Sequence, residues 1–200
     1  MIDLSLTDFI DVVSKIGPQK ATKLSQIKHR PPYQPAFDYY KPLRDHIAAL
    51  HKSGGSKTSF MQPSQLTADS KKWTNYAELI ADYQSFWGRK SFQWFDPAHR
   101  PWTSNGVEIS INPELGLVIN GVPHVVKLYF KSEKLSKQRA DTSLFLMHQF
   151  LPRQYSGQNI VYSILDIREK NLIPVGAFPA NILASLIGES AYIQSVWPTL

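Results

Sequence analysis

The first candidate for chemistry is a run of basic side chains in the middle of the chain. Ammonium and guanidinium groups gathered in this way can bind phosphate oxygens, as at the backbone of a nucleic acid. A charged connection between a strand and a helix is also commonly just solvated, so both interpretations stay open. The basic residues are Lys127, Lys131, Lys134, Lys137 and Arg139, interrupted by the single acid Glu133.

A second basic group lies near the amino terminus. Two short helices are predicted on either side of Gly17-Pro18, and Lys20 and Lys23 belong to the second. In a helix-turn-helix arrangement these lysines would face the major groove of DNA. Two helices joined by a glycine turn also occur as plain hairpins that pack on a larger domain, and this interpretation is favoured here. Lys20 and Lys23 nevertheless remain candidate nucleic-acid-binding residues.

Composition and spacing exclude several other kinds of site. The chain contains no Cys, which removes thiolate nucleophiles, disulfides and Cys-ligated zinc or iron–sulfur centres. Its six His lack the i, i+4 spacing of a helical metal site. The stretch Gly54-Gly55-Ser56-Lys57 lacks the first glycine and the preceding buried strand of a phosphate-binding loop.

Aromatic residues are dense in two stretches, Tyr33–Tyr40 and Trp87–Trp102. Exposed rings could stack on nucleic-acid bases or line a ligand groove. Large aromatic side chains more commonly belong to the hydrophobic core, which we expect for most of these. A small-molecule pocket walled by residues 83–102 is kept as a third, separate interpretation.

The elements that must position these residues follow from hydrophobic periodicity. Pro31-Pro32 ends the second helix, and we expect the chain from His29 to Pro35 to be extended. Apolar residues at helical spacing predict amino-terminal helices over about 6–16, 20–28 and 43–52, and a further helix over about 73–88.

A Ser-, Gly-, Thr- and Pro-rich stretch from residue 53 to residue 70 is the one plausible internal boundary. The sequence therefore predicts a helical amino-terminal arm or subdomain over residues 1–60. Residues 61–200 would form the core domain.

In the core the hydrophobic period changes from that of a helix to that of a strand. Alternating apolar residues over 107–131 predict three antiparallel strands, with Asn120-Gly121 as a hairpin turn. A helix from Lys137 to Leu151, a buried strand over 159–167, a weaker strand and an apolar helix should follow. These elements predict an α/β (α+β) protein with a mixed sheet of about four to five strands in αβββαβ order.

From Trp73 to about residue 170 this order resembles the core of the PD-(D/E)XK nuclease superfamily. In that family a proline–acid pair opens the second strand, and an acid-x-Lys triplet lies on the third. Pro113-Glu114 and Val125-Val126-Lys127 occupy the corresponding positions. The resemblance implies two acids that hold Mg²⁺ and a lysine that orients water at a phosphodiester. It makes Glu114 and Lys127 the candidate catalytic residues, with Glu114 also a metal ligand.

This sequence departs from the family pattern at the second acid. Val125 stands in its place and cannot bind Mg²⁺, because hard cations require oxygen ligands. Some members of the family recruit this acid from another element. The candidates here are Glu78, Glu108 and Asp141.

The resemblance implies a nucleic-acid-associated protein with a nuclease-like core, acting on DNA or RNA by metal-dependent hydrolysis of phosphodiesters. The alternative is a non-catalytic interaction or regulatory module of a larger bacterial-type assembly, with a protein as its partner. Val125 favours the alternative, so whether the protein is an enzyme stays open.

Overall charge and hydropathy add weak constraints. The formal net charge of +6, from 22 Lys and Arg against 16 Asp and Glu, gives a mild preference for anionic partners. The segment MIDLSLTDF carries no basic region of the kind that begins a secretion signal, and no apolar stretch approaches about 18 residues. We therefore expect a cytoplasmic protein with no membrane partner.

Overall fold

The amino terminus begins with a short strand rather than directly with a helix. In the computed structural model, which describes residues 1–31 and 38–200, strand β1 (Ile2–Ser5) leads straight into helix α1 (Leu6–Val13). Ser5 caps this helix, since its Oγ accepts a hydrogen bond from the backbone N–H of Asp8 at 3.0 Å. The predicted extended segment from His29 to Pro35 lies largely outside the described residues.

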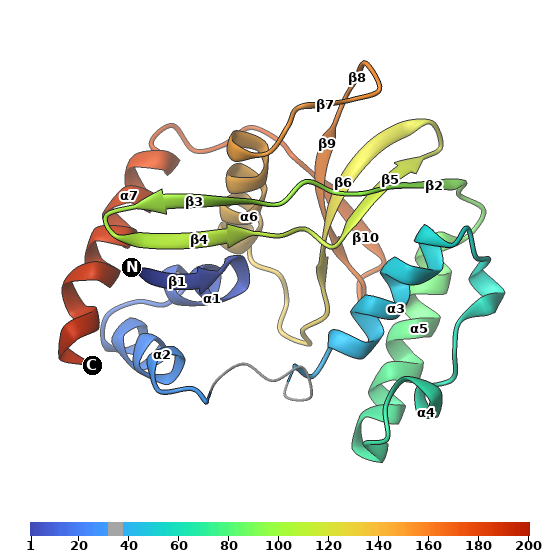
Figure 1. Cartoon of the computed structure of the whole chain (residues 1–200), viewed down its shortest axis with the longest axis horizontal. Helices are drawn as coiled ribbons and strands as arrows, with labels where there is room; N and C mark the ends of the chain where they lie inside the picture. Colours follow the sequence, from blue (N-terminus) through green and yellow to red (C-terminus); the bar gives the residue numbers. More distant parts are fainter. Residues whose placement is uncertain (32–37) are drawn as a thin grey trace.

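A five-stranded mixed sheet forms the centre of the molecule, in the strand order β10-β9-β6-β5-β2 (Figure 1). Its central pair, β6 (Val122–Tyr129) and β9 (Val161–Asp166), is parallel, and the other neighbours are antiparallel. Helix α6 (Lys137–Phe150) connects the parallel pair, as a crossover between parallel strands requires. The remaining strands are β2 (Phe92–Phe95), β5 (Leu115–Ile119) and β10 (Asn171–Pro174). The expected α/β class and mixed sheet are confirmed.

One of the three strands predicted as a single antiparallel set belongs to a different sheet. Residues Val107–Ile111 form β4, which lies between β1 and β3 (Arg100–Ser104) in a three-stranded sheet. Both edges of β4 are occupied, so β5 pairs with β2 instead. The prediction was wrong here because alternation identifies the face that is buried and does not identify the neighbouring strand.

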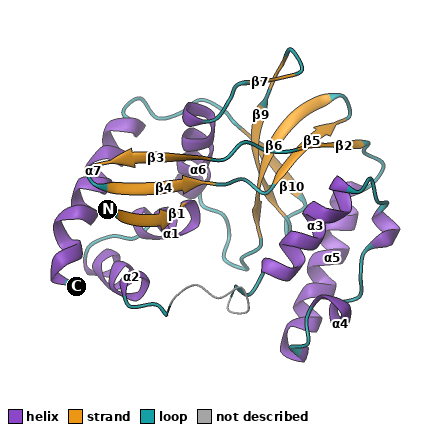
Figure 2. Ribbon diagram, in the orientation of Figure 1, coloured by secondary structure: helices purple, strands orange, loops and turns teal. Residues whose placement is uncertain are grey.

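The two faces of the central sheet are covered by different helices (Figure 2). One hydrophobic cluster joins the sheet to α3 (Lys41–Lys52) and α5 (Trp73–Trp87). It contains Val126 and Leu128 of β6 and Phe130, which follows the strand. Val125 faces the other way, into a cluster with α1 and α6. This division follows from the strand, in which successive side chains point to opposite faces.

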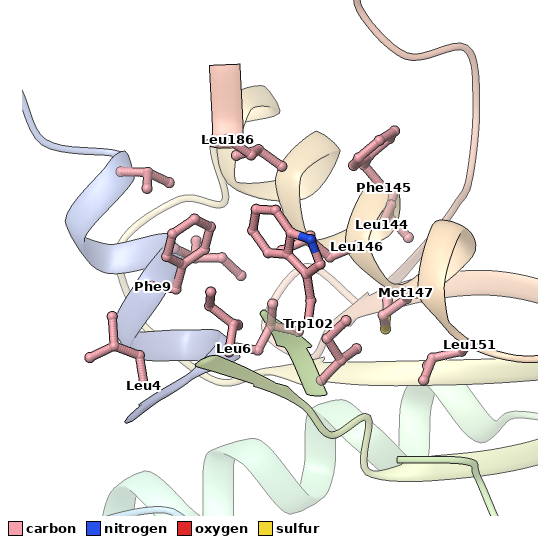
Figure 3. Packing of buried hydrophobic residues seen from close by; sticks show 14 of the residues in the cluster. Leu4, Leu6, Phe9, Trp102, Leu144, Phe145, Leu146, Met147, Leu151 and Leu186 are labelled. Carbon is pink, nitrogen blue, oxygen red and sulfur yellow. The ribbon is translucent and has the colours of Figure 1, made fainter. Parts of the chain in front are cut away.

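The cluster on the α6 face joins elements that are distant in the sequence. Figure 3 shows Phe9 of α1 beside Trp102 of β3, and their ring centroids lie 6.0 Å apart in an edge-on arrangement. Leu144 of α6 and Leu186 of α7 (Ile182–Val196) pack into the same cluster. The predicted division of the chain at residue 60 stays a prediction, although the residues of β1 and α1 are part of this core.

Short elements complete the described chain. They are α2 (Pro18–Lys28), α4 (Pro63–Leu66), the hairpin strands β7 (Gln154–Tyr155) and β8 (Gln158–Asn159), and 3-10 turns at Lys57–Ser59, Ser70–Lys72 and Trp197–Thr199. Among the residues that the structure describes, no helix is long and apolar enough to span a bilayer.

Gly116 permits the close pairing of β5 with β2. A Cβ at this position would collide with the carbonyl oxygen of Phe95 and lie 2.7 Å from a carbon of its ring. We expect Gly116→Ala to lower the free energy of unfolding by about 1 to 3 kcal/mol, because the edge strand must shift. Urea denaturation measures this loss.

Gly188 of α7 provides the matched control, since a Cβ there would meet nothing within 4 Å. Alanine has the higher helix propensity, so Gly188→Ala should stabilise the protein by up to about 1 kcal/mol. Equal effects of the two substitutions would contradict the proposed clash.

Candidate functional site

Glu114 and Lys127, which the sequence pattern singled out, meet at the end of the β5–β6 pair. Leu115 lies opposite Val126 in the antiparallel register, so the two candidate residues are neighbours across the strands. Lys127 Nζ donates to Glu114 Oε1 at 2.6 Å, and the backbone N–H of Leu128 donates to Glu114 Oε2 at 2.8 Å. Both carboxylate oxygens are therefore already engaged.

This ion pair is largely shielded from solvent. The side chains of Lys127 and Glu114 are 12% and 11% exposed. Lys127 Nζ also donates to the carbonyl oxygen of Asn112 at 3.2 Å, which ties it to the turn before β5. Lys127 is thus neither a solvent-facing strand residue nor a free cation.

The pair lies on the wall of a cavity of about 1010 Å³. Its described lining residues come mainly from β1 and α1, from the start of α3, from the turn before β5 and from the end of β6. Figure 1 shows α1 and α3 on opposite sides of these strand ends. Acidic and basic side chains are equally numerous among the described lining residues. The acids are Asp3, Asp8, Asp11, Asp38, Asp45 and Glu114, and the bases are Arg30, Lys41, Arg44, Lys127, Lys131 and Arg139.

Asp11 of α1 organises a second group of charges in this cavity. Its Oδ1 accepts hydrogen bonds from Lys131 Nζ and from Arg139 Nη1, each at 2.6 Å, and Lys23 Nζ lies 3.5 Å from Oδ2. Burial by itself would raise the pKa of Asp11. The hydrogen bonds from Lys131 and Arg139 outweigh it, so the pKa lies below its usual value.

The third wall of the cavity comes from the start of α3. Arg44 Nη2 donates to Asp38 Oδ2 at 2.8 Å. Burial works to lower the pKa of Arg44, but the hydrogen bond and charge of Asp38, with the charge of Glu114, raise it overall. Tyr40 stacks on Phe130 with ring centroids 5.1 Å apart, which fixes this wall to the end of β6.

The predicted nucleic-acid-binding lysines and arginine are mostly paired within the chain. Lys20 lies 2.7 Å from Glu189 of α7, and Lys137 lies 2.6 Å from Asp141 one turn further along α6. Lys23, Lys131 and Arg139 converge on Asp11, and Arg139 is buried. Lys134 is exposed in the connection before α6. The structure therefore brings Lys131 and Arg139 to the cavity, while Lys20, Lys23, Lys134 and Lys137 are not among its described lining residues.

The candidate sources of a second acid lie elsewhere. Glu108 is on β4 in the three-stranded sheet, and Glu78 is an exposed residue of α5 whose carboxylate lies 3.8 Å from Arg168. Asp141 pairs with Lys137. None of the three belongs to the described lining of the cavity that holds Glu114.

The residues present do not fit the two-acid magnesium site that the resemblance implies. Val125 is 2% exposed and packed in the core, and it offers no oxygen ligand. Both oxygens of Glu114 accept hydrogen bonds. Within the described ranges, no three His, Asp or Glu side chains are grouped so as to hold a metal ion. We therefore derive no metal-dependent step.

The aromatic stretch of residues 83–102 packs mainly inward. Trp87 stacks on His51 at 4.4 Å between ring centroids, and Phe92 meets Trp87 edge-on at 5.0 Å. His99 is its only member among the described lining residues of the large cavity. The cavity therefore does not support the interpretation of this stretch as the wall of a ligand pocket. Of the other aromatic stretch, Tyr33 and Phe37 lie outside the described residues.

Sequence patterns did not single out Asp11, Asp38 or Arg44, and they included Tyr39 only in an aromatic stretch expected to lie mostly in the core. These residues come from segments that meet the sheet only in the folded chain, so no local spacing connects them to Glu114 or Lys127. Helix α1, with one apolar face and the two acids Asp8 and Asp11, has the pattern of an ordinary amphipathic helix.

Comparisons of the chain with models of protein families, with curated proteins and with solved structures found no match.

Proposed function

We propose that this protein binds the sugar–phosphate backbone of a nucleic acid in the cavity, on a nuclease-like core that lacks the second magnesium-binding acid of the family pattern. The observation that carries the proposal is the meeting of Glu114 and Lys127 at 2.6 Å on the wall of a cavity of about 1010 Å³. Cations from separate segments surround this pair. Their ammonium and guanidinium groups are the usual partners of phosphate oxygens.

The arrangement of the sheet supports the same proposal. Strands β2, β5, β6 and β9 are consecutive neighbours, α5 precedes them, and α6 connects the parallel pair β6 and β9. Glu114 immediately precedes β5 and Lys127 lies on β6, the two central antiparallel strands of this group, where the resemblance implies an acid and a lysine. The hairpin of β3 and β4 is inserted between β2 and β5.

Two cations at the rim of the cavity are available to contact phosphate. Arg30 is 55% exposed and pairs with Asp8, and Lys131 is 33% exposed and pairs with Asp11. The carboxylates of Asp8 and Asp11 are only 15% and 13% exposed, but each cation keeps a solvent-accessible side from which it can contact a phosphate. Lys127 and Arg139 are more deeply buried and hold the cavity wall in place.

The rim cations allow a direct test by fluorescence anisotropy of labelled DNA and RNA at several salt concentrations. The unmodified protein should bind with affinity that falls as salt rises. The double variant Arg30→Gln/Lys131→Gln should bind more weakly, with the slope of log affinity against log salt reduced by about 1 to 2, since each phosphate contact contributes about 0.7 to 0.9.

Lys52→Gln/Lys170→Gln is the matched control. Both lysines are exposed and paired with an aspartate, and neither is among the described lining residues. This variant should retain the original slope. Absence of binding at low salt, or an equal loss in the control, would overturn the proposal.

The same mixtures incubated with Mg²⁺ or Mn²⁺ test for hydrolysis on a gel. We expect intact substrate, because both oxygens of Glu114 accept hydrogen bonds and the described residues contain no group of three or more His, Asp or Glu that could hold a metal ion. Metal-dependent cleavage that disappears in Glu114→Gln would instead make the protein a nuclease with an acid recruited from elsewhere.

The second candidate is a non-catalytic interaction or regulatory module that binds a protein. It is favoured by the internal pairing of the predicted basic residues, such as Lys20 with Glu189 and Lys137 with Asp141. This candidate predicts no binding of nucleic acid even at low salt.

A further inference from the structure

Tyr39 is a large aromatic side chain that remains exposed at the cavity. It is 38% exposed, whereas the neighbouring Tyr76 is fully buried. Tyr39 is also one of the residues that line the cavity. An exposed aromatic ring at a polar cavity can stack on a flat ligand. Any nucleic-acid base can serve as this ligand, because every base has a π-face.

The ring of Tyr39 is held in place by its neighbours. Its hydroxyl accepts a hydrogen bond from Asn75 Nδ2 at 3.3 Å, and its carbonyl oxygen accepts one from the hydroxyl of Tyr76. Tyr40 packs edge-on against it, with ring centroids 4.8 Å apart. A ring fixed in this way loses little conformational entropy when a ligand stacks on it.

A lysine and a second aromatic side chain both contact this ring. Lys72 Nζ lies over the Tyr39 ring, 5.0 Å from its centre, so a base that stacks on this face displaces the ammonium group, which can then contact the flanking phosphate. Tyr40 joins the ring to Phe130 at the end of β6. Phe130 is three residues beyond Lys127, or roughly 10 Å along the strand at about 3.3 Å per residue.

The size of the cavity favours unpaired nucleotides over a duplex. A volume of about 1010 Å³ is that of a site for a small ligand and accommodates a few nucleotides of one strand. In a duplex the bases are stacked inside the helix, and their faces are not available to a side chain. A base can reach the ring of Tyr39 only when it is unpaired.

We propose that the cavity binds single-stranded nucleic acid, with the ring of Tyr39 stacked on a base and Lys72 and the rim cations contacting the flanking phosphates. The inference rests on the proposed function and names the form of nucleic acid that the cavity takes. Because base stacking tolerates any sequence, little preference among bases is expected.

Anisotropy with labelled eight-nucleotide single strands of DNA and of RNA, and with blunt duplexes of the same length, tests this inference. The full chain should bind the single strands about tenfold or more tightly than the duplexes. Tyr39→Leu, which keeps an apolar side chain and removes the ring, should weaken single-strand binding about tenfold, within the range measured for loss of one stacking contact. Tyr39→Phe, which keeps the ring, should restore it.

Trp73→Leu is the matched control, because Trp73 is 40% exposed and is not among the described lining residues. It should leave single-strand binding unchanged. Thermal melting of each variant shows whether the fold is retained. If Tyr39→Leu does not fold, Tyr39→Phe still tests the inference, because it should bind single strands as the unmodified protein does.

The outcomes separate this inference from the function on which it rests. Equal binding of single strands and duplexes, or equal losses in Tyr39→Leu and Trp73→Leu, would overturn the stacking site and leave nucleic-acid binding standing. No binding of any strand at low salt would overturn both. Binding of RNA alone or of DNA alone, with the loss in Tyr39→Leu, would support the inference and identify the strand.

Discussion

Asp11→Ala is expected to lower the free energy of unfolding by about 3 to 5 kcal/mol, the range for removing one partner of a buried ion pair. Asp11 accepts hydrogen bonds from Lys131 and Arg139, and the side chain of Arg139 is only 7% exposed. Lys131 can turn toward solvent when the carboxylate is lost. Arg139 cannot, so its guanidinium would remain buried with only the exposed Glu133, 3.6 Å away, as an acidic partner among the described residues. Urea denaturation of the purified variant measures the effect.

Two further variants make this prediction specific. Asp45 is 54% exposed and pairs with Lys41 one helical turn away, so Asp45→Ala should change stability by no more than about 0.5 kcal/mol. The double variant Asp11→Leu/Arg139→Met replaces the buried pair with apolar side chains and should recover much of the loss. A loss in Asp11→Ala as small as that in Asp45→Ala would show that Arg139 is solvated.

The second large effect is a loss of stability in acid that originates at His51 of α3. His51 is 5% exposed, stacks on Trp87, and shares a hydrogen bond of 2.7 Å between its Nε2 and the hydroxyl of Tyr83. Burial lowers the pKa of His51 from 6.5 to about 4. Burial also raises the pKa of Tyr83, so its hydroxyl stays protonated. The folded protein therefore holds His51 in its neutral form.

The sign of the pH effect follows from this difference in pKa. Above pH 6.5 the imidazole is neutral in both the folded and the unfolded chain, and the full stability is present. As the pH falls from 6.5 toward 4, only the unfolded chain takes up the proton. The free energy of unfolding should fall by roughly 3 kcal/mol over this interval because of His51, at about 1.4 kcal/mol per unit of pKa difference.

Urea denaturation at pH 7.5, 6, 5 and 4 measures this dependence. His51→Gln should be less stable at pH 7.5 and should lose less of its remaining stability on acidification than the unmodified protein. His29→Gln removes an exposed imidazole of the α2 terminus and should keep the original pH dependence. If His51→Gln and the unmodified protein have the same pH dependence, His51 is not held neutral in the fold.

Residues close in the sequence could be read correctly because their pairing depends on local geometry. Asn120-Gly121 predicts the tight turn between β5 and β6, and both residues adopt positive φ angles. Once this hairpin forms, its register places Glu114 beside Lys127, so the sequence alone brought the two candidate residues to adjacent strands. The helix over Lys137–Phe150, the buried strand after it and the α/β class also followed from periodicity.

The pairing partners of the other strands could not be predicted from local sequence. The alternation in Val107–Ile111 predicts a strand with one buried face, but the side chains do not specify whether β1, β2 or β5 lies beside it. Strand pairing is decided by hydrogen bonds between segments far apart in the chain. Because β4 pairs with β1 and β3, Glu108 lies in the smaller sheet, which is not the sheet beside Glu114.

The sequence by itself determined the class of fold, the hairpin beside which Glu114 and Lys127 meet, and the absence of cysteine chemistry. Only the tertiary structure decided which charges surround that pair. Asp11, Arg44 and Tyr39 reach the cavity through the packing of α1 against α6 and of α3 against α5. The physical reason is that local periodicity reports which side chains are buried, whereas the partner of each charge depends on which helices cover each face of the sheet.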